Sequence, residues 1–252
     1  MNIVLLTALG VGGATFIGAL FGFIFKNISH KSSDIVIAFA SGVMLAAAVF
    51  GLIMPSLEYG GNFSVFVTII GVFCGALILK LLDKIIPHLH RLSGVDIEAH
   101  SQNNEQLSKV LLFVMAIAIH NLPEGIAAGV GFGTGNTSEA LAIAGGIALQ
   151  NIPEGMVIIA PMLASGISKK RTLVLALLTG LVEVLGTFLG YFAVSISNAI
   201  LPFALAFAGG TMLYVISDEM IPETHSHGSQ SGATFSLLAG FSLMLIIDFY
   251  LG

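Results

Sequence analysis

Composition excludes an ordinary water-soluble protein. The chain has 252 residues, of which 56% are hydrophobic and 9% are charged, whereas about 25% are charged in a typical soluble domain. We therefore expect an all-α membrane protein, folded as a single polytopic membrane domain over residues 1–252. The net charge of −5 and the absence of a large basic patch exclude nucleic-acid binding.

Eight hydrophobic segments are long enough to cross a bilayer, since a transmembrane helix needs about 20 apolar residues. The stretch 184–217 carries no charge, and we divide it where Ser197, Asn198 and Pro202 favour a turn. The sequence therefore predicts eight transmembrane helices. In chain order they cover residues 2–25, 33–54, 63–83, 109–133, 138–164, 172–194, 199–217 and 233–251.

The basic residues predict the orientation of these spans. All nine flank or lie in the first, third and fifth loops, while the second, fourth and sixth loops have none. Positively charged loops stay on the cytoplasmic side. We therefore expect a multi-pass protein of the cell membrane with both termini extracellular. The nine residues are Lys26, Lys31, Lys80, Lys84, Arg91, Lys109, Lys169, Lys170 and Arg171.

Two polar segments lie on the cytoplasmic side of this topology. The loop 84–108 contains His88, His90 and His100. The acidic and histidine-bearing loop 218–232 contains Asp218, Glu219, Glu223, His225 and His227. Two interpretations stay open, namely a solvated linker and a surface that accepts metal ions transiently, because histidine-rich tracts bind metals.

Ionisable side chains inside the spans are the main functional signal. A charged group at mid-membrane costs about 2.5–3.5 kcal/mol on insertion scales, yet Glu124, Glu154, Glu183 and His120 lie inside predicted spans. His120, Gln150 and Glu183 are each 11 or 12 residues from the start of their span. At ~1.5 Å per residue this depth is roughly 17 Å, about half of a ~30 Å hydrocarbon core. Three helices therefore bring polar groups to one level.

A duplicated motif places most of these groups. His120-Asn121-Leu122-Pro123-Glu124-Gly125 aligns with Gln150-Asn151-Ile152-Pro153-Glu154-Gly155 at an offset of 30 residues, with four of six positions identical. The first and fifth residues of each copy share a helix face. Because the two spans run in opposite directions, the copies form an inverted repeat, as in carriers whose sites lie at the midplane.

The carboxylates need a positive partner that the chain itself lacks. No Lys or Arg lies in the interior of any predicted span, and three ionised carboxylates would repel one another at low dielectric. Protons or metal ions could neutralise them, and the residue types favour metal. Imidazole, carboxylate and thioether ligands suit a borderline divalent first-row ion such as Zn²⁺ better than Mg²⁺ or Ca²⁺.

Two glutamates could bridge two such ions. Glu124 and Glu154 would be shared between them. His120, Gln150 and Met44, which is at the same depth in its own span, would complete one site. Asn121, Asn151 and Glu183 would complete the other.

These residues resemble the ZIP (Zrt/Irt-like protein) family of divalent metal transporters, in its bacterial-type branch. The resemblance covers nearly the whole chain and is most specific at the paired motif, with further matches at Glu183 and over 217–225. It implies a 3+2+3 arrangement in which spans 1–3 and 6–8 are inverted relatives around spans 4 and 5. Many members have His at position 150 and some have Asp or Glu at position 151, so the neutral amides of Gln150 and Asn151 lower the charge of this site.

The resemblance implies transport of divalent cations into the cytoplasm through a mid-membrane binuclear site by alternating access. The substrate would be Zn²⁺, another divalent first-row metal or Cd²⁺, entering past Glu58 and Asp248 near the outer surface. Two rivals stay open, a membrane-embedded zinc hydrolase and a sensor that holds metal without moving it. The usual His-Glu-x-x-His arrangement of a hydrolase is absent. Oligomeric state also stays open, with a homodimer as one option.

Overall fold

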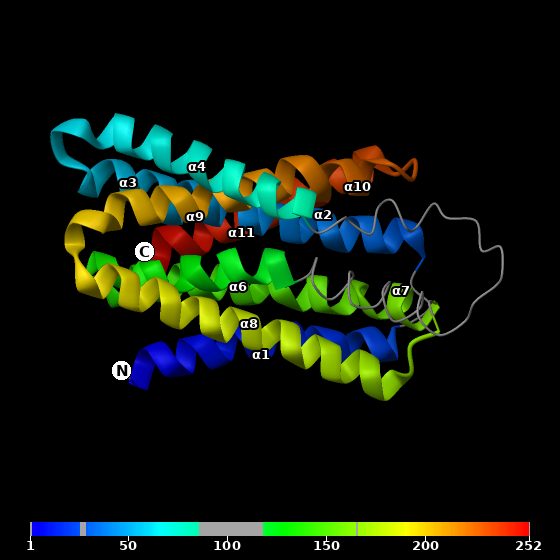
Figure 1. Cartoon of the computed structure of the whole chain (residues 1–252). Coiled ribbons are helices and arrows are strands. Elements are labelled where there is room, and N and C mark those ends of the chain that lie inside the picture. The colour runs from blue at the N-terminus through cyan, green and yellow to red at the C-terminus, as the bar shows by residue number, and fades with distance from the viewer. Residues whose placement is uncertain (1, 26–28, 86–117, 165, 252) are drawn as a thin grey trace.

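Helices make up nearly all of the computed structural model, which describes residues 2–25, 29–85, 118–164 and 166–251 (Figure 1). Those residues contain no strand. An all-helical protein is what the composition predicts. The α-helices are α1 (Asn2–Ile24), α2 (His30–Ala46), α3 (Met54–Tyr59), α4 (Ser64–Ile85), a helix over 118–130, α6 (Thr137–Val157), α7 (Ile159–Ala164), α8 (Lys169–Ile196), α9 (Leu201–Val215), α10 (Ile221–His225) and α11 (Gln230–Leu251).

Six segments in the described part of the chain are long and apolar enough to cross a membrane. They are Asn2–Ile24, His30–Tyr59, Gly61–Leu82, Lys169–Ile196, Leu201–His225 and Gln230–Leu251. Each matches one of the eight predicted spans. Of the other two, 109–133 begins outside the described residues, and α6 is less apolar because it carries Gln150, Asn151 and Glu154. The loop 84–108, with its three histidines, also lies outside the described side chains.

The long helices form two groups that meet along α2 and α6. Helix α1 packs against α6 and α8, whereas α2 packs against α11 and α4 against α9. In Figure 1 the start of α1 and the end of α11 lie towards the same end of the bundle. The chain therefore crosses the length of the bundle an even number of times.

Close helix contacts occur in matching pairs. A Cβ atom at Gly42 of α2 would overlap the carbonyl oxygen of Leu237 on α11, and one at Gly210 of α9 would overlap that of Val72 on α4. Gly42 and Gly210 are separated by 168 residues. The same interval separates Thr15 on α1 from Glu183 on α8, so both pairs occupy corresponding positions in the two halves of the chain. Small residues at such positions let helix backbones touch in a membrane. The α2–α11 and α4–α9 pairs thus make equivalent contacts.

Two π-helical segments, Ala47–Ile53 and Ile216–Met220, continue α2 and α9. Each is followed by a short α-helix whose second residue is proline, Pro55 in α3 and Pro222 in α10. A proline ring has no N–H and clashes with the carbonyl four residues earlier, and a π turn is one way for a helix to accommodate that defect. Helix therefore continues to His225, although the sequence predicts a loop from residue 218.

Candidate metal centre

Glu183 is the point at which four helices meet. Its side chain on α8 is fully buried. Thr15 Oγ1 of α1 and Asn121 Nδ2 of helix 118–130 donate hydrogen bonds to Oε1 at 2.6 and 2.5 Å, and Asn151 Nδ2 of α6 donates to Oε2 at 2.6 Å. The structure thus brings together Asn121, Asn151 and Glu183, three of the predicted ligands. Thr15 joins them, although a lone threonine in an apolar span gave no signal in the sequence.

The glycines of the duplicated motif explain why these helices come so close. A Cβ atom at Gly125 would overlap the main-chain oxygen of Glu183, and one at Gly155 would overlap that of Thr15. The glycine of each copy therefore packs directly against a neighbouring backbone, Gly125 against α8 and Gly155 against α1. These are the helices that carry Glu183 and Thr15, which are joined by a hydrogen bond. This packing holds Glu124 and Glu154, one residue earlier in each copy, beside the same buried region.

A cavity of about 250 Å³ extends from this region towards α10. It lies between α1, α2, α6, helix 118–130 and the segment from α9 to α10. Neither Lys nor Arg is among the described residues that line it. The polar lining consists of Thr15, His120, Asn121, Glu124, Glu154, Glu219 and Glu223, and the remainder of Ile37, Gly155, Val157, Ile158, Val215 and Met220.

Glu124 is a buried carboxylate without a hydrogen bond from the described residues. It is 2% exposed, and neither of its oxygens has a hydrogen-bond partner among the described residues. Glu154 and Glu183 are close enough to interact with it electrostatically, and Gln150 lies beside it. A buried carboxylate needs hydrogen bonds or an opposite charge. Glu124 therefore has the surroundings of a cation ligand.

Gln150 and Asn151 carry neutral amide groups next to these carboxylates, Gln150 beside Glu124 and Asn151 bonded to Glu183. Both residues are buried on α6. Within the described chain, Gln150 Oε1 and Asn151 Oδ1 accept no hydrogen bond. Buried polar atoms are nearly always paired, so these unpaired oxygens favour a further ligand, an ion or water.

Met44 lies in the hydrophobic core. Its side chain on α2 is 1% exposed. Like Gln150, Asn151 and Glu183, it is not among the described residues that line the cavity. Its role as a thioether ligand stays a prediction.

His120 has a partner that the sequence did not indicate. Its Nε2 lies 3.1 Å from Oε1 of Glu219, and it also interacts with Glu154. Glu219 was predicted to lie in a loop. The π-helical segment Ile216–Met220 instead keeps it on a helix beside the cavity. Pro222 is the sequence feature that could have indicated a helix at Glu219, because a proline after a π turn is compatible with a continuing helix.

The carboxylates alone do not form a closed metal site. Within the described residues, no group of three or more His, Cys, Asp or Glu side chains could hold a metal ion. Amide oxygens or water molecules would have to complete any coordination shell. Weak, mixed ligation of this kind suits an ion that binds and leaves, rather than a locked structural zinc site.

One family and several individual proteins are similar to this chain. Residues 95–248 match the family described as ZIP Zinc transporter. The chain is 40% identical to zinc transporter GufA of Myxococcus xanthus, over 98% of each chain. It is 37% identical to zinc transporter ZIPB of Bordetella bronchiseptica, over 95% of this chain and 78% of that one. It is also 32% identical to zinc transporter ZupT of Chlorobaculum parvum, over 93% and 92%.

Proposed function

The chain belongs to the ZIP family of zinc transporters, and we propose that it carries Zn²⁺ across the membrane through the cavity between α1, α6, helix 118–130 and α9–α10. Zinc transport is the function that its relatives share by name, and it is not an enzymatic activity. These relatives give no support to a membrane-embedded zinc hydrolase. Other first-row divalent ions and Cd²⁺ are further candidate substrates, because the donor atoms would accept them.

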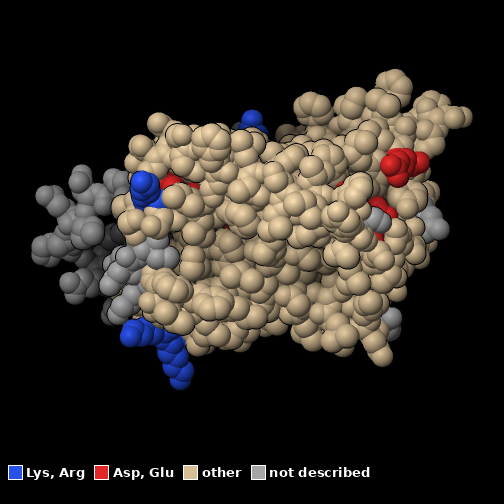
Figure 2. Space-filling model, turned by 180° about the vertical axis from the view of Figure 1, so that it is seen from behind, with Lys and Arg blue, Asp and Glu red and all other residues tan. Residues whose placement is uncertain are grey.

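We propose eight spans in an inverted 3+2+3 arrangement, with both termini outside the cell. The matched contacts of α2–α11 and α4–α9 support the inverted relation. So does the pairing of Gly125 with α8 and of Gly155 with α1. In Figure 2 the blue side chains lie mainly near one end of the molecule and a red group lies near the other, which fits a cytoplasmic side rich in Lys and Arg.

The observation that carries the metal-site proposal is the state of Glu124. Its two buried oxygens have no partner in the described structure, and neither Lys nor Arg lies among the described residues lining the cavity. We propose that an ion binds there with His120, Gln150 and Glu154 as further ligands. A second ion would bind between Glu154 and the cluster of Asn121, Asn151 and Glu183.

We further propose that transport runs inward by alternating access. Glu58 and Asp248 both lie close enough to Glu139 to interact with it, and this acidic group would collect cations at the outer end. The cavity reaches Glu223 at the other end of the bundle, where the ion would leave. A homodimer stays a prediction from the sequence.

Flux through purified protein in liposomes tests this function. Zinc uptake, followed with an indicator trapped inside, should fall at least about tenfold in Glu124→Gln and in His120→Ala, since each loses a ligand worth about 1.4 kcal/mol or more. Ser195→Ala, an exposed change on α8, should leave uptake unchanged. Unchanged uptake in both ligand variants would contradict the metal-site assignment. Stoichiometric zinc binding without any uptake by the unaltered chain would support a sensor instead.

A further inference from the structure

Thr15 lies where the two halves of the chain face each other across α1 and α8. A Cβ atom at Gly12 would overlap the main-chain oxygen of Gly180, and one at Gly180 would overlap that of Gly12. These two glycines are 168 residues apart, like Thr15 and Glu183, which follow them by three residues, nearly one helical turn. The repeat therefore makes Thr15 the counterpart of the carboxylate Glu183 in the other half of the chain.

The surroundings of Thr15 fix the direction of its hydroxyl. The residue is 3% exposed and lines the central cavity. Its main-chain oxygen is the atom that a Cβ atom at Gly155 would overlap, so the duplicated motif packs directly on this part of α1. A β-branched side chain also has few rotamers. The Oγ1 atom of Thr15 is therefore held beside Oε1 of Glu183, 2.6 Å away.

The two carboxylate oxygens of Glu183 are bonded unequally. Within the described chain, Oε1 accepts hydrogen bonds from Thr15 and Asn121, whereas Oε2 accepts one, from Nδ2 of Asn151. An ion could therefore reach Oε2 by displacing a single donor. Asn151 Oδ1 is buried and accepts no hydrogen bond from the described residues, so this amide has an oxygen to offer the ion in place of the bond that it loses.

Thr15 differs from the two amide donors in its chemistry. An amide carries a donor nitrogen and an acceptor oxygen, and the oxygen can bind a cation. Asn121 and Asn151 are both ligands of the second ion in the function proposed above, so each has a reason to exchange its bond to Glu183 for a bond to that ion. The hydroxyl of Thr15 has no such role, and it can keep its hydrogen bond to Oε1 while the ion binds.

We propose that Thr15 is a positioning residue for the transported ion, which holds Oε1 of Glu183 so that Oε2 is presented to the second zinc ion. This inference rests on the proposed function, since it concerns the second of the two ions. A ligand held in its binding position loses less conformational freedom when the ion binds. A carboxylate at position 15 would instead add another buried negative charge beside Glu183. One half of the repeat thus supplies the ligand, and the other half holds it.

Equilibrium dialysis with radioactive Zn²⁺ on the full-length chain in nanodiscs tests this role. A His120→Ala background removes a ligand of the first ion alone, so that the second ion is measured. Thr15→Val should then weaken zinc binding at least tenfold, whereas Thr15→Ser should stay within twofold. Thr187→Val is the matched control and should also stay within twofold, because the hydroxyl of Thr187 bonds the main-chain carbonyl of Glu183. Equal affinity in Thr15→Val and Thr15→Ser would overturn the proposal, as would the absence of zinc binding in the background itself.

Thr15→Ala keeps the test decisive if Thr15→Val does not fold, because it removes the hydroxyl with a smaller side chain and should weaken the same binding at least tenfold. With His120 intact, either variant should keep the first ion within twofold and lose affinity for the second. Equal weakening of both ions would indicate a general structural role and overturn the proposal.

Uptake into liposomes gives a separate measurement. Thr15→Val should raise the zinc concentration for half-maximal uptake severalfold, with a smaller change in the maximal rate, because it weakens binding of the ion. An unchanged half-maximal concentration would contradict the role of Thr15. Absence of uptake by the unaltered chain would instead refute the proposed function, and the dialysis result would still decide whether Thr15 positions Glu183.

Discussion

At the scale of single residues, two of the three central carboxylates, Glu183 and Glu124, differ in what surrounds them. Glu183 accepts three hydrogen bonds from three helices, whereas Glu124 accepts none from the described residues. Hydrogen bonds to a charged group contribute about 1.5–3 kcal/mol each. Glu183 therefore has the partners that a buried carboxylate needs, and Glu124 does not. On the proposal made above, Glu183 organises the site and Glu124 receives the ion.

This difference predicts opposite effects of the same chemical change on stability. Glu183→Gln should lower the free energy of unfolding of the metal-free protein by about 1.5–3 kcal/mol, because the amide cannot accept all three bonds. Glu124→Gln should leave it unchanged or raise it, because a buried unpaired charge disappears. Thermal unfolding in detergent with a chelator measures both. Equal destabilisation by the two variants would contradict this division of roles.

Thr15 is the one hydrogen-bond donor of Glu183 that lies outside the predicted site. Thr15→Val should cost about 1 kcal/mol of stability, since the carboxylate loses a donor without a change in side-chain shape. Thr15→Ser should recover most of that loss. Thr187→Val is the matched control, because the hydroxyl of Thr187 bonds the main-chain carbonyl of Glu183 and not its carboxylate. The same unfolding assay tests all three, and a larger loss at Thr187 would argue against a special role for Thr15.

At the scale of helices, glycine contacts fix how closely the motif helices approach α1 and α8. A Cβ atom at Gly18 would overlap the main-chain oxygen of Ile152, and one at Gly186 would approach that of Leu122. Gly18 and Gly186 are separated by 168 residues, as Thr15 and Glu183 are. The residues that they contact, Ile152 and Leu122, are separated by 30 residues, which is the offset between the two copies of the motif. The duplication seen in the motif therefore extends to the helices against which it packs.

Alanine at these glycines should separate the helices. Gly18→Ala and Gly186→Ala should each destabilise the protein by about 1–3 kcal/mol, the usual cost of overpacking. Gly145→Ala, on α6 with nothing within 4 Å of the added carbon, should be neutral or stabilise by up to about 1 kcal/mol, because alanine favours a helix. Unfolding midpoints and zinc uptake should fall together in the first two variants. Stability at Gly18→Ala equal to that at Gly145→Ala would refute the close contact.

The sequence predicts those features that hydropathy and local spacing determine. The duplicated motif predicts that Asn121, Asn151 and Glu183 share a site, because a buried carboxylate needs partners at its own depth. The continuation of α9 to His225 could not be predicted from the charges of Asp218 and Glu219, which are typical of a loop. Those charges are tolerated on a helix because Glu219 faces a polar cavity and His120. Tertiary surroundings decide this, and the local sequence does not contain them.

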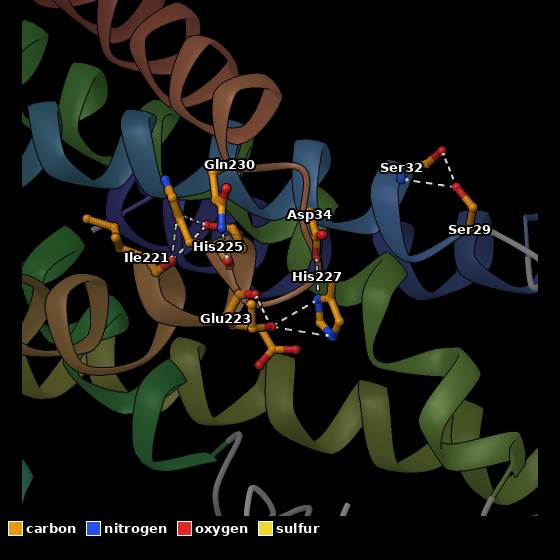
Figure 3. A network of polar contacts seen from close by, with 10 residues as sticks. Ser29, Ser32, Asp34, Ile221, Glu223, His225, His227 and Gln230 are labelled. Atoms are coloured by element: carbon orange, nitrogen blue, oxygen red, sulfur yellow. Dashed lines mark hydrogen bonds and ion pairs between the residues drawn. The ribbon is translucent and has the colours of Figure 1, made fainter.

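At the scale of the whole molecule, both ends of the chain lie at one end of the bundle, opposite the turn that contains His227 (Figure 1). The acidic group of Glu58, Glu139 and Asp248 comes from the end of α3, the start of α6 and the end of α11, whereas the pair of Asp34 and His227, 3.1 Å apart, joins the start of α2 to the turn before α11 (Figure 3). On the transport path proposed above, a cation moving between the two groups would pass the central carboxylates. The direction of that route depends only on which end faces the cytoplasm.

Labelling of single cysteines from one side of the membrane determines that direction. The experiment is simple to build in this chain because Cys74 is its one cysteine. In a Cys74→Ala background, single cysteines replace Asn62 and Asn136 at one end and Ser29 and Ser229 at the other. In intact cells a membrane-impermeant maleimide should label Asn62→Cys and Asn136→Cys and should reach the other two only after lysis, because the loops rich in Lys and Arg stay inside. The reverse pattern would invert the topology. Glu58 would then mark the exit, and Glu223 would meet the ion before the central site does.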